Sequence, residues 1–238
     1  MKIGKNIPRH FYTFWGNNGI NKSKFSELRY LVPYSINKYV KWPITIYIDD
    51  NEPDNKWWIK TINLNSVTVT HISKIAPKLY KTKWVKPDYI SDVLPYKILG
   101  QIGGIFIDFD MLFFKKPLEL IDKYDMGVDT LESGTAHPDL LFSIPNSDVL
   151  SVYDDTLDYI VNDRGKKRWF SMKRFLSLSS KYKFTLVDYH HFNLYTPSKL
   201  RSDKLTPIPD NMSGLHMRIG KRGMRKSPFL NSILDKYL

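Results

Sequence analysis

The sequence predicts an α/β fold: a single Rossmann-like, mainly parallel sheet flanked by helices, followed by an irregular C-terminal region. The chain has 238 residues, of which 42% are hydrophobic and 25% charged, enough to bury the core of one large domain. Short apolar strands alternate with helical stretches in the first half, which implies a mainly parallel sheet. No internal repeat and no apolar run of transmembrane length complicates this pattern.

The expected elements follow in order. Strands are expected over residues 10–15, 43–48, 67–72 and 105–108. A helix is expected over 23–39 despite Pro33, and a second over 88–102, where apolar residues recur at helical spacing. Ser91 is the expected N-cap of the second helix, which would place Pro95 near its first turn. Gly103 and Gly104 are expected to end this helix.

Charge and cysteine content limit the class of partner and the compartment. The net charge of +12 favours anionic partners such as nucleic acid, anionic membrane or phosphorylated small molecules, although a solvated lysine-rich surface explains it equally well. The absence of cysteine excludes disulfides and thiolate metal sites. The N-terminus lacks the apolar stretch of a signal peptide, so a cytoplasmic protein of bacterial or viral origin is expected.

The most informative stretch is Gly-Gly-Ile-Phe-Ile-Asp-Phe-Asp at residues 103–110. Carboxylates at the end of a buried strand require compensation of their charge. In an extended segment Asp108 and Asp110 point to the same side, so both could face one cation. Oxygen ligands without cysteine favour Mg²⁺ or Mn²⁺. The alternative is a polar turn with two solvated aspartates.

Other polar or aromatic residues also fall at expected strand ends. Trp15 and Asp49 join Asp108 and Asp110 there, at the edge of a parallel sheet where ligands bind. Trp15, beside the glycine turn at Gly16, either belongs to the core or offers a stacking face to a planar base. The carboxylate of Asp92 either interacts favourably with the dipole at the start of the helix or reaches the sugar or ribose of a ligand.

The region around His216 carries a dense basic segment. Five basic residues occur over 218–226, at a spacing that would suit a solvated helix face. Gly220 and Gly223 argue against a helix and favour a loop that wraps a diphosphate. Lys221 and Arg222 lie at its centre. The pair His190 and His191 is interpreted as structural.

These motifs resemble the DXD-type glycosyltransferases of the GT-A fold. The resemblance is to the retaining group with a glycosyltransferase sugar-binding region, which includes yeast-type α-mannosyltransferases, bacterial capsular transferases and, distantly, the clostridial glucosylating toxins. Residues 7–16, Ile-Pro-Arg-His-Phe-Tyr-Thr-Phe-Trp-Gly, are similar to that family's opening motif. Residues 91–99 and 103–110 resemble its "SDxxRxxxLxxxGGxYxDxD" segment. The likeness extends over about residues 7–115 and then fades.

The resemblance implies a role for each matching residue. Trp15, with Gly16, would stack on the nucleotide base, and Asp92 would bind donor-sugar hydroxyls. Asp110 would ligate the metal, and Asp108 would contact ribose, sugar or metal-bound water. These three aspartates are the expected catalytic residues. Further positions are expected to contact the substrate or to complete the metal and phosphate site: Gly104, Phe106, Asp139, Lys221, Arg222 and His216. Asp139 could equally be an ordinary loop aspartate after Pro138.

Two positions depart from the family pattern. Phe106 replaces a tyrosine, and Pro95 replaces an arginine that normally helps to hold the donor sugar. The departure at Pro95 implies an altered sugar, a substitute basic residue or a reduced activity. A catalytically impaired sugar-nucleotide-binding relative is therefore one alternative.

Together these features predict a metal-dependent retaining glycosyltransferase of the hexosyltransferase type, using Mn²⁺ or Mg²⁺. It would move a sugar from a UDP- or GDP-linked donor to a glycan or other hydroxyl acceptor, with peripheral membrane association as an option. Residues 1–238 would form one domain, with 1–115 binding the nucleotide-sugar and 116–238 on the acceptor side. A basic nucleic-acid-binding module, which the net charge of +12 and the 14% aromatic content would suit, is a weaker alternative, because it explains neither the carboxylates nor Gly-Gly; nucleic acid is not an expected partner.

Overall fold

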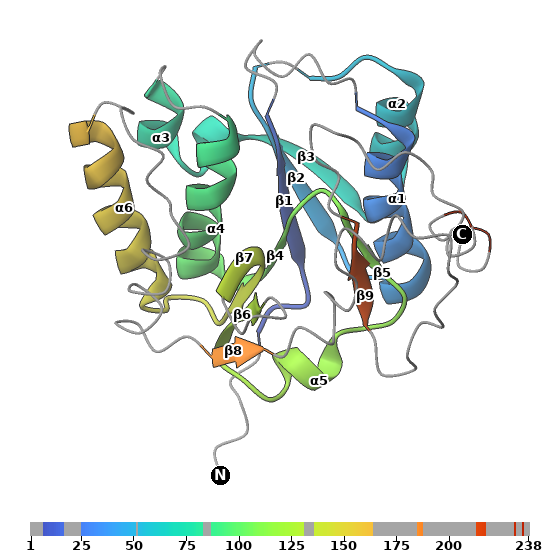
Figure 1. The fold of residues 1–238 in the computed structure, drawn as a ribbon. Helices are drawn as coiled ribbons and strands as arrows, with labels where there is room; N and C mark the ends of the chain where they lie inside the picture. Colours follow the sequence, from blue (N-terminus) through green and yellow to red (C-terminus); the bar gives the residue numbers. More distant parts are fainter. Residues whose placement is uncertain are drawn as a thin grey trace.

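A computed structural model describes residues 7–16, 25–50, 52–82, 87–130, 136–163, 185–187 and 213–217, together with Asn231 and Asp235. A seven-stranded sheet forms its centre, in the order β3-β2-β1-β4-β7-β6-β8 (Figure 1). The strands are β1 (Phe11–Trp15), β2 (Ile44–Ile48), β3 (Val67–His71), β4 (Gly104–Ile107), β6 (Met126–Thr130), β7 (Ala136–Ser143) and β8 (Thr185–Val187). The four strands expected in the first half are confirmed within about two residues at each end.

The sheet has a parallel half and a half that contains one reversed strand. β3, β2, β1 and β4 pair in parallel, whereas β7 runs antiparallel to both β4 and β6. β1 and β2 pair over their full lengths, with Trp15 opposite Ile48, and Ile48 lies opposite His71 of β3. These three strands therefore end level with one another, as expected of an edge at which a ligand binds.

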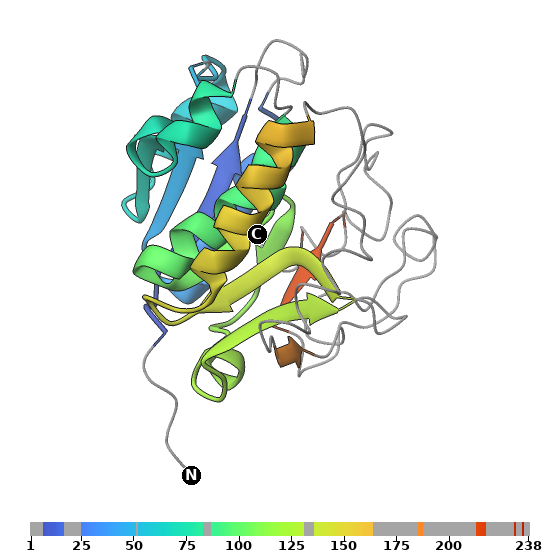
Figure 2. The ribbon, with the colours of Figure 1, turned by 90° about the vertical axis from the view of Figure 1, so that its left-hand side faces the viewer.

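Helices cover both faces of this sheet (Figure 1; Figure 2). One face carries α1 (Glu27–Ser35), its π-helical continuation η1 (Ile36–Val40) and α2 (Lys56–Ile62). The other carries α3 (Pro77–Lys81), α4 (Pro87–Ile102) and α6 (Val149–Asp163), while α5 (Leu118–Ile121) and the 3₁₀ turn η2 (Ile72–Lys74) are short connections. A separate two-stranded sheet pairs β5 (Met111–Phe113) with β9 (Gly214–His216). Among the described residues, no helix combines the length and apolar character needed to cross a bilayer.

The helix expected over 88–102 is confirmed, but its start is not where the sequence suggested. α4 begins at Pro87, so Ser91 lies inside the helix and is not its N-cap. Proline suits the first helical position, because its missing N–H would have no helical partner there. Pro95 consequently falls in the middle of α4, where it removes one helical hydrogen bond. Gly103 ends the helix as expected, with φ of +67° and its N–H donated to the Leu99 carbonyl at 2.9 Å.

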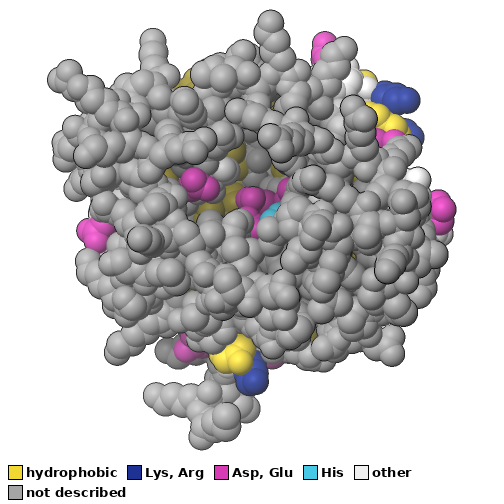
Figure 3. Space-filling model, viewed as in Figure 1, with side chains coloured by type: hydrophobic (Ala, Val, Ile, Leu, Met, Phe, Trp, Pro, Cys, Tyr) yellow, Lys and Arg dark blue, Asp and Glu magenta, His cyan; other side chains and the backbone are white. Residues whose placement is uncertain are grey.

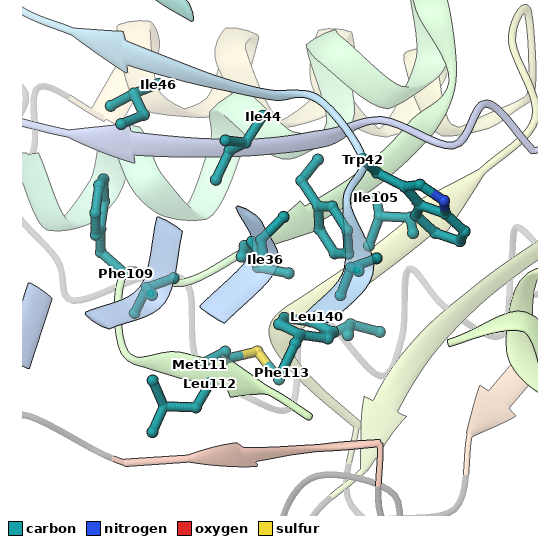
Figure 4. Close-up of a cluster of buried hydrophobic side chains, with 14 of the residues drawn as sticks. Ile36, Trp42, Ile44, Ile46, Ile105, Phe109, Met111, Leu112, Phe113 and Leu140 are labelled. Carbon is teal, nitrogen blue, oxygen red and sulfur yellow. The ribbon is translucent and has the colours of Figure 1, made fainter. Parts of the chain in front are cut away.

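Two buried clusters form the core, one on each face of the sheet. The first joins α1 and η1 to β2, β4 and β5, and Figure 4 shows Phe109, Met111 and Phe113 packed beneath Ile44 and Ile46. The second joins α4 and α6 to the opposite face, and it includes Phe106. Gly100 of α4 allows the two helices to approach closely, since a Cβ there would lie 2.5 Å from the Leu150 nitrogen of α6.

Candidate active site

The turn after β4 carries the two aspartates of the expected metal motif. β4 pairs with β7 up to Ile107 and Leu140, and the next residue, Asp108, donates its backbone N–H to the Asp139 carbonyl at 2.8 Å. Asp139 therefore lies within strand β7 and not in a loop, and it is only 3% exposed. The pairing of β4 with β7 thus places the carboxylates of two distant segments side by side.

The small β5–β9 sheet brings His216 to the same place. Met111 lies opposite His216 in this ladder, and the Met217 N–H donates to the Asp110 carbonyl at 2.7 Å. Asp110 immediately precedes β5, and His216 is the last residue of β9. Two backbone ladders therefore converge on one point, although their strands are far apart in the sequence.

His216 bridges two carboxylates in this structure. Its Nε2 atom is 3.1 Å from Oδ1 of Asp110, and its Nδ1 atom is 2.8 Å from Oδ2 of Asp139. All three side chains are buried, with exposed fractions of 5% for His216 and Asp139 and 12% for Asp110. We call Asp110, Asp139 and His216 the buried ion cluster. A histidine with a carboxylate at each nitrogen is favoured in its doubly protonated form.

Burial and mutual charge shift the pKa values of this cluster and of its neighbour Asp108. Burial alone would lower the pKa of His216, but the charges and hydrogen bonds of Asp139 and Asp110 raise it well above its usual value. Burial acts to raise the pKa of Asp110, but the positive charge of His216 outweighs it and holds that pKa below its usual value. Burial and the charges of Asp139 and Asp110 raise the pKa of Asp108 well above its usual value. The surroundings of Asp108, apolar and negatively charged at once, therefore disfavour its ionised form.

Asp92 faces this group from helix α4. Its negative charge contributes to the raised pKa of Asp108. It is the sixth residue of α4, beyond the first turn to which the stabilising dipole effect is confined. The helix dipole therefore does not explain the position of Asp92, and its contact with a donor sugar stays a prediction. Figure 3 shows a hollow on this face of the molecule, at whose floor acidic side chains and a histidine are visible.

Arg29 is a site residue that the sequence did not indicate. Its Nη1 atom donates to the Phe109 carbonyl at 3.2 Å, within the Asp108–Asp110 turn. The guanidinium carbon lies 5.3 Å from the centre of the Trp15 ring, and the charge of Arg29 helps to lower the pKa of Asp110. No motif surrounds Arg29 in the sequence. The only local signal was its place early in a helix that follows the first strand.

Trp15 lies at the end of β1, as expected, but it is largely buried. It is 6% exposed and makes edge-to-face contacts with Phe25 and Phe109, at 5.2 and 6.0 Å between ring centres. Its indole N–H is buried and has no hydrogen-bond partner among the described residues. Buried indole N–H groups usually have such a partner. Stacking of Trp15 on a base stays a prediction, as does the turn role of Gly16.

Other expected site residues lie elsewhere or outside the described residues. Phe106 is 1% exposed within the core cluster of α4 and α6. Gly104 begins β4, at the end of the strand away from Asp108, with φ of +109°. A Cβ there would lie 2.6 Å from the Tyr12 ring, so packing requires this glycine. Lys221 and Arg222 of the expected phosphate loop, and the pair His190 and His191, fall outside the described residues.

The donor set suits a hard divalent cation in its chemistry. Asp108, Asp110 and Asp139 supply carboxylate oxygens, which Mg²⁺ and Mn²⁺ prefer. Burial and the charges of Asp139 and Asp110 disfavour the ionised form of Asp108, and a bound cation would offset these effects. In the part of the chain that the structure describes, no three such side chains form a ready-made metal cage. His216, which contacts two carboxylates here, stays a predicted ligand.

Comparison with known proteins places the fold. No family model matches the chain, and no curated protein sequence matches it. Solved structures do match, among them the PaToxG glycosyltransferase, at 19% identity and a TM-score of 0.53 over 74% of this chain and 72% of that one. The galactosyltransferase LgtC, solved with donor and acceptor sugar analogues, matches at 9% identity and a TM-score of 0.51 over 90% and 88%.

A third match extends over more of the chain. The apo form of the glycosyltransferase GlyE of Streptococcus pneumoniae TIGR4 is similar at 11% identity and a TM-score of 0.53. That likeness spans 96% of this chain but 59% of GlyE. The fold is therefore the GT-A fold of glycosyltransferases, as the sequence predicted. At these identities the likeness defines the fold alone.

Proposed function

We propose that this protein is a metal-dependent retaining glycosyltransferase that uses a nucleotide-diphosphate sugar. The observation that carries the proposal is the convergence of Asp108, Asp110, Asp139 and His216 beside the ends of the parallel strands. Ligands bind at such an edge in open α/β sheets. LgtC, which has the same fold, was solved with donor and acceptor sugar analogues, which supports a sugar donor and a sugar acceptor here. The UDP- or GDP-linked form of the donor is proposed from the sequence motif.

Asp110 and Asp108 would hold Mn²⁺ or Mg²⁺ in this scheme. When bound, the cation would act as a Lewis acid that stabilises negative charge on the departing diphosphate. Arg29 would fix the turn that presents both aspartates, through its hydrogen bond to the Phe109 carbonyl. Asp92 and Asp139 would face the donor sugar and accept hydrogen bonds from its hydroxyls. Lys221 and Arg222 are proposed to add positive charge beside the diphosphate.

The buried ion cluster would hold the acidic groups in place before the donor arrives. His216 neutralises part of the charge of Asp110 and Asp139 at 3.1 and 2.8 Å. A preorganised site of this kind avoids rearranging charged groups during the reaction. The acceptor, a glycan or other hydroxyl compound, would attack the sugar from the face that the nucleotide diphosphate leaves, so the anomeric configuration would be retained. The leaving diphosphate would accept the proton of the attacking hydroxyl.

The test is release of nucleotide diphosphate from a panel of UDP- and GDP-sugars with and without Mn²⁺. Mn²⁺-dependent release that Asp110→Ala abolishes would support the proposal, and the preferred base and sugar would identify the donor. Pro95 and Phe106, which differ from the related motif, favour one competing outcome. Saturable donor binding without release, with every acceptor tried, would instead indicate a sugar-nucleotide-binding protein.

A further inference from the structure

Ser35 is a buried polar residue at the junction of α1 and η1. It is the last residue of α1 and is 1% exposed. Its Oγ atom donates to the Val32 carbonyl at 2.8 Å and accepts the backbone N–H of Phe113 at 3.1 Å. The single hydroxyl proton is used on Val32, so a lone pair of the oxygen faces Phe113. Ser35 therefore connects the helix to strand β5 through a hydrogen bond of defined direction.

This hydrogen bond holds the edge of β5 that faces away from β9. On the β9 side, Phe114 donates its N–H to the Ser213 carbonyl at 2.9 Å. Successive N–H groups of a strand point to opposite edges, so the N–H of Phe113 points away from β9 and toward Ser35. Figure 4 shows the same arrangement, with Ile36 of η1 on one side of β5 and strand β9 on the other. β5 is thus fixed between a helix and a strand.

Helix α1 also holds the segment that precedes β5. Arg29 donates to the Phe109 carbonyl at 3.2 Å, and Ser35 accepts the N–H of Phe113 at 3.1 Å. These two attachment points lie on either side of Asp110 in the sequence. A single helix therefore fixes the stretch of backbone that presents Asp110.

The position of β5 determines the geometry of the buried ion cluster. Met111 of β5 lies opposite His216, and the Met217 N–H donates to the Asp110 carbonyl at 2.7 Å. A displacement of β5 would therefore change the 3.1 Å contact between Asp110 and His216. In a buried ion pair, water cannot replace a contact that has lengthened.

We propose that Ser35 is a positioning residue, which sets the contact between Asp110 and His216 by fixing β5 from the side opposite β9. Groups behind the ligands of a metal site orient them in this way, and their loss typically weakens metal binding by about 10- to 100-fold. The effect on metal binding rests on the function proposed above. The effect on the ion contact does not, because that contact is present without a cation.

The first test is a double-mutant cycle without metal. Chemical denaturation in the presence of a chelator would measure S35A, H216Q and the double variant. If Ser35 positions the ion contact, H216Q should lower the free energy of unfolding less in S35A than in the wild type. If Ser35 only adds stability, the two losses should add. S35C, whose thiol is a weaker acceptor, should give an intermediate result and serves the same cycle should S35A fail to fold.

Thr61 provides the matched control. It is buried, and its hydroxyl donates to the Trp57 carbonyl at 2.9 Å, within α2. T61V removes this hydroxyl without touching β5, so H216Q should cost as much in T61V as in the wild type. Additive losses in S35A or S35C would overturn the proposal, as would non-additivity of equal size in T61V.

The second test measures Mn²⁺ binding directly, by electron paramagnetic resonance of the free ion. At a temperature where every variant is fully folded by circular dichroism, S35A should raise the dissociation constant about tenfold. T61V should bind Mn²⁺ as the wild type does. Wild-type affinity in folded S35A would overturn the role of Ser35 in metal binding. A wild-type protein that binds no Mn²⁺ would contradict the proposed function alone, because the cycle contains no metal.

Discussion

The buried ion cluster has an exposed counterpart in the same molecule. His71, the last residue of β3, lies 3.0 Å from Asp50, which also accepts hydrogen bonds from the Tyr80 hydroxyl at 2.6 Å. The Asp50 side chain is 66% exposed, whereas that of Asp110 is 12% exposed. The chemical groups are alike, but water screens the charges around Asp50 and not those of the buried ion cluster. We call Asp50, His71 and Tyr80 the exposed cluster.

The two clusters differ in how far each charged group depends on its partners. In the buried ion cluster each charge depends on its partners, because water cannot replace them. In the exposed cluster water can solvate each group after a partner is lost. Substitutions of similar chemistry in the two clusters should therefore have very different effects.

The largest effect is expected from Asp110. Asp110→Ala should lower Mn²⁺-dependent nucleotide release by at least about a thousandfold, since cation stabilisation of the leaving group contributes several kcal/mol. Asp50→Ala, which removes an exposed carboxylate, is the matched control and should retain most of the activity. A similar loss in both variants would show that the exposed cluster belongs to the active site.

The next effect concerns stability. Asp139→Asn should lower the free energy of unfolding by about 3 to 5 kcal/mol, because it removes one partner of a buried ion pair. Chemical denaturation in the presence of a chelator would measure this. His71→Gln is the counterpart in the exposed cluster and should leave the denaturation midpoint almost unchanged. A stable Asp139→Asn protein would mean that His216 is neutral in the folded chain.

The pH dependence of stability should also separate the two clusters. The pKa of His216 is raised above its usual 6.5, so its contribution is complete below that pH and is lost as the pH rises toward the folded-state value. Without divalent cations, the stability difference between wild type and His216→Gln should be largest in mild acid and shrink above pH 6.5. Denaturation curves across this range test it, and a difference that grows with pH would contradict the charged state of His216.

A smaller effect is expected at Arg29. Arg29→Met removes the hydrogen bond to the Phe109 carbonyl and a positive charge near Asp110. We expect a roughly tenfold loss of nucleotide release, equivalent to about 1.4 kcal/mol, and a higher Mn²⁺ requirement. Arg29→Lys should recover part of the Mn²⁺ affinity if charge matters, and none if the planar hydrogen-bonding group is needed.

The smallest effect is expected at Tyr80 of the exposed cluster. Tyr80→Phe removes both hydrogen bonds to Asp50, so the pKa of that carboxyl, which they hold below its usual value, should rise. Thermal unfolding should show no resolvable change, because Asp50 remains solvated. A clear loss of stability would mean that the exposed cluster is shielded from water more than its exposure suggests.

The sequence was sufficient to predict the parallel half of the fold and the position of Asp108 and Asp110 directly after a buried strand. Runs such as Ile44–Ile48 are apolar, short and bounded by polar residues, which makes strands easy to recognise. The sequence pattern predicts too late a start for α4, because Ser91 is a good capping residue while Pro87 gives a weaker local signal. Tertiary packing carries the helix through Pro95 against local preference.

The assembly of the buried ion cluster could not be predicted in the same way. Asp139 meets Asp108 only because β7 pairs with β4, and His216 meets Asp110 only because β9 pairs with β5. Pairings between distant strands leave no local pattern at either aspartate or at the histidine. The family resemblance indicated Asp139 and His216 as site residues. Their contacts with the aspartates of the Asp108–Asp110 turn became visible only from the two strand pairings. Arg29 is not part of any motif in the resemblance, and its partner is the backbone carbonyl of Phe109, which leaves no pattern in the sequence.

The ladder between β4 and β7 also has a consequence for how this chain can change during evolution. Asp139 takes its orientation from the alternation of β7, in which Leu140 and Leu141 face opposite core clusters. Insertion or deletion of one residue between Asp139 and Ser143 would turn the carboxylate to the other side of the sheet. Substitutions can accumulate along this strand, but changes of its length cannot. Among descendants of this chain, the spacing of β7 should therefore outlast the identity of its side chains.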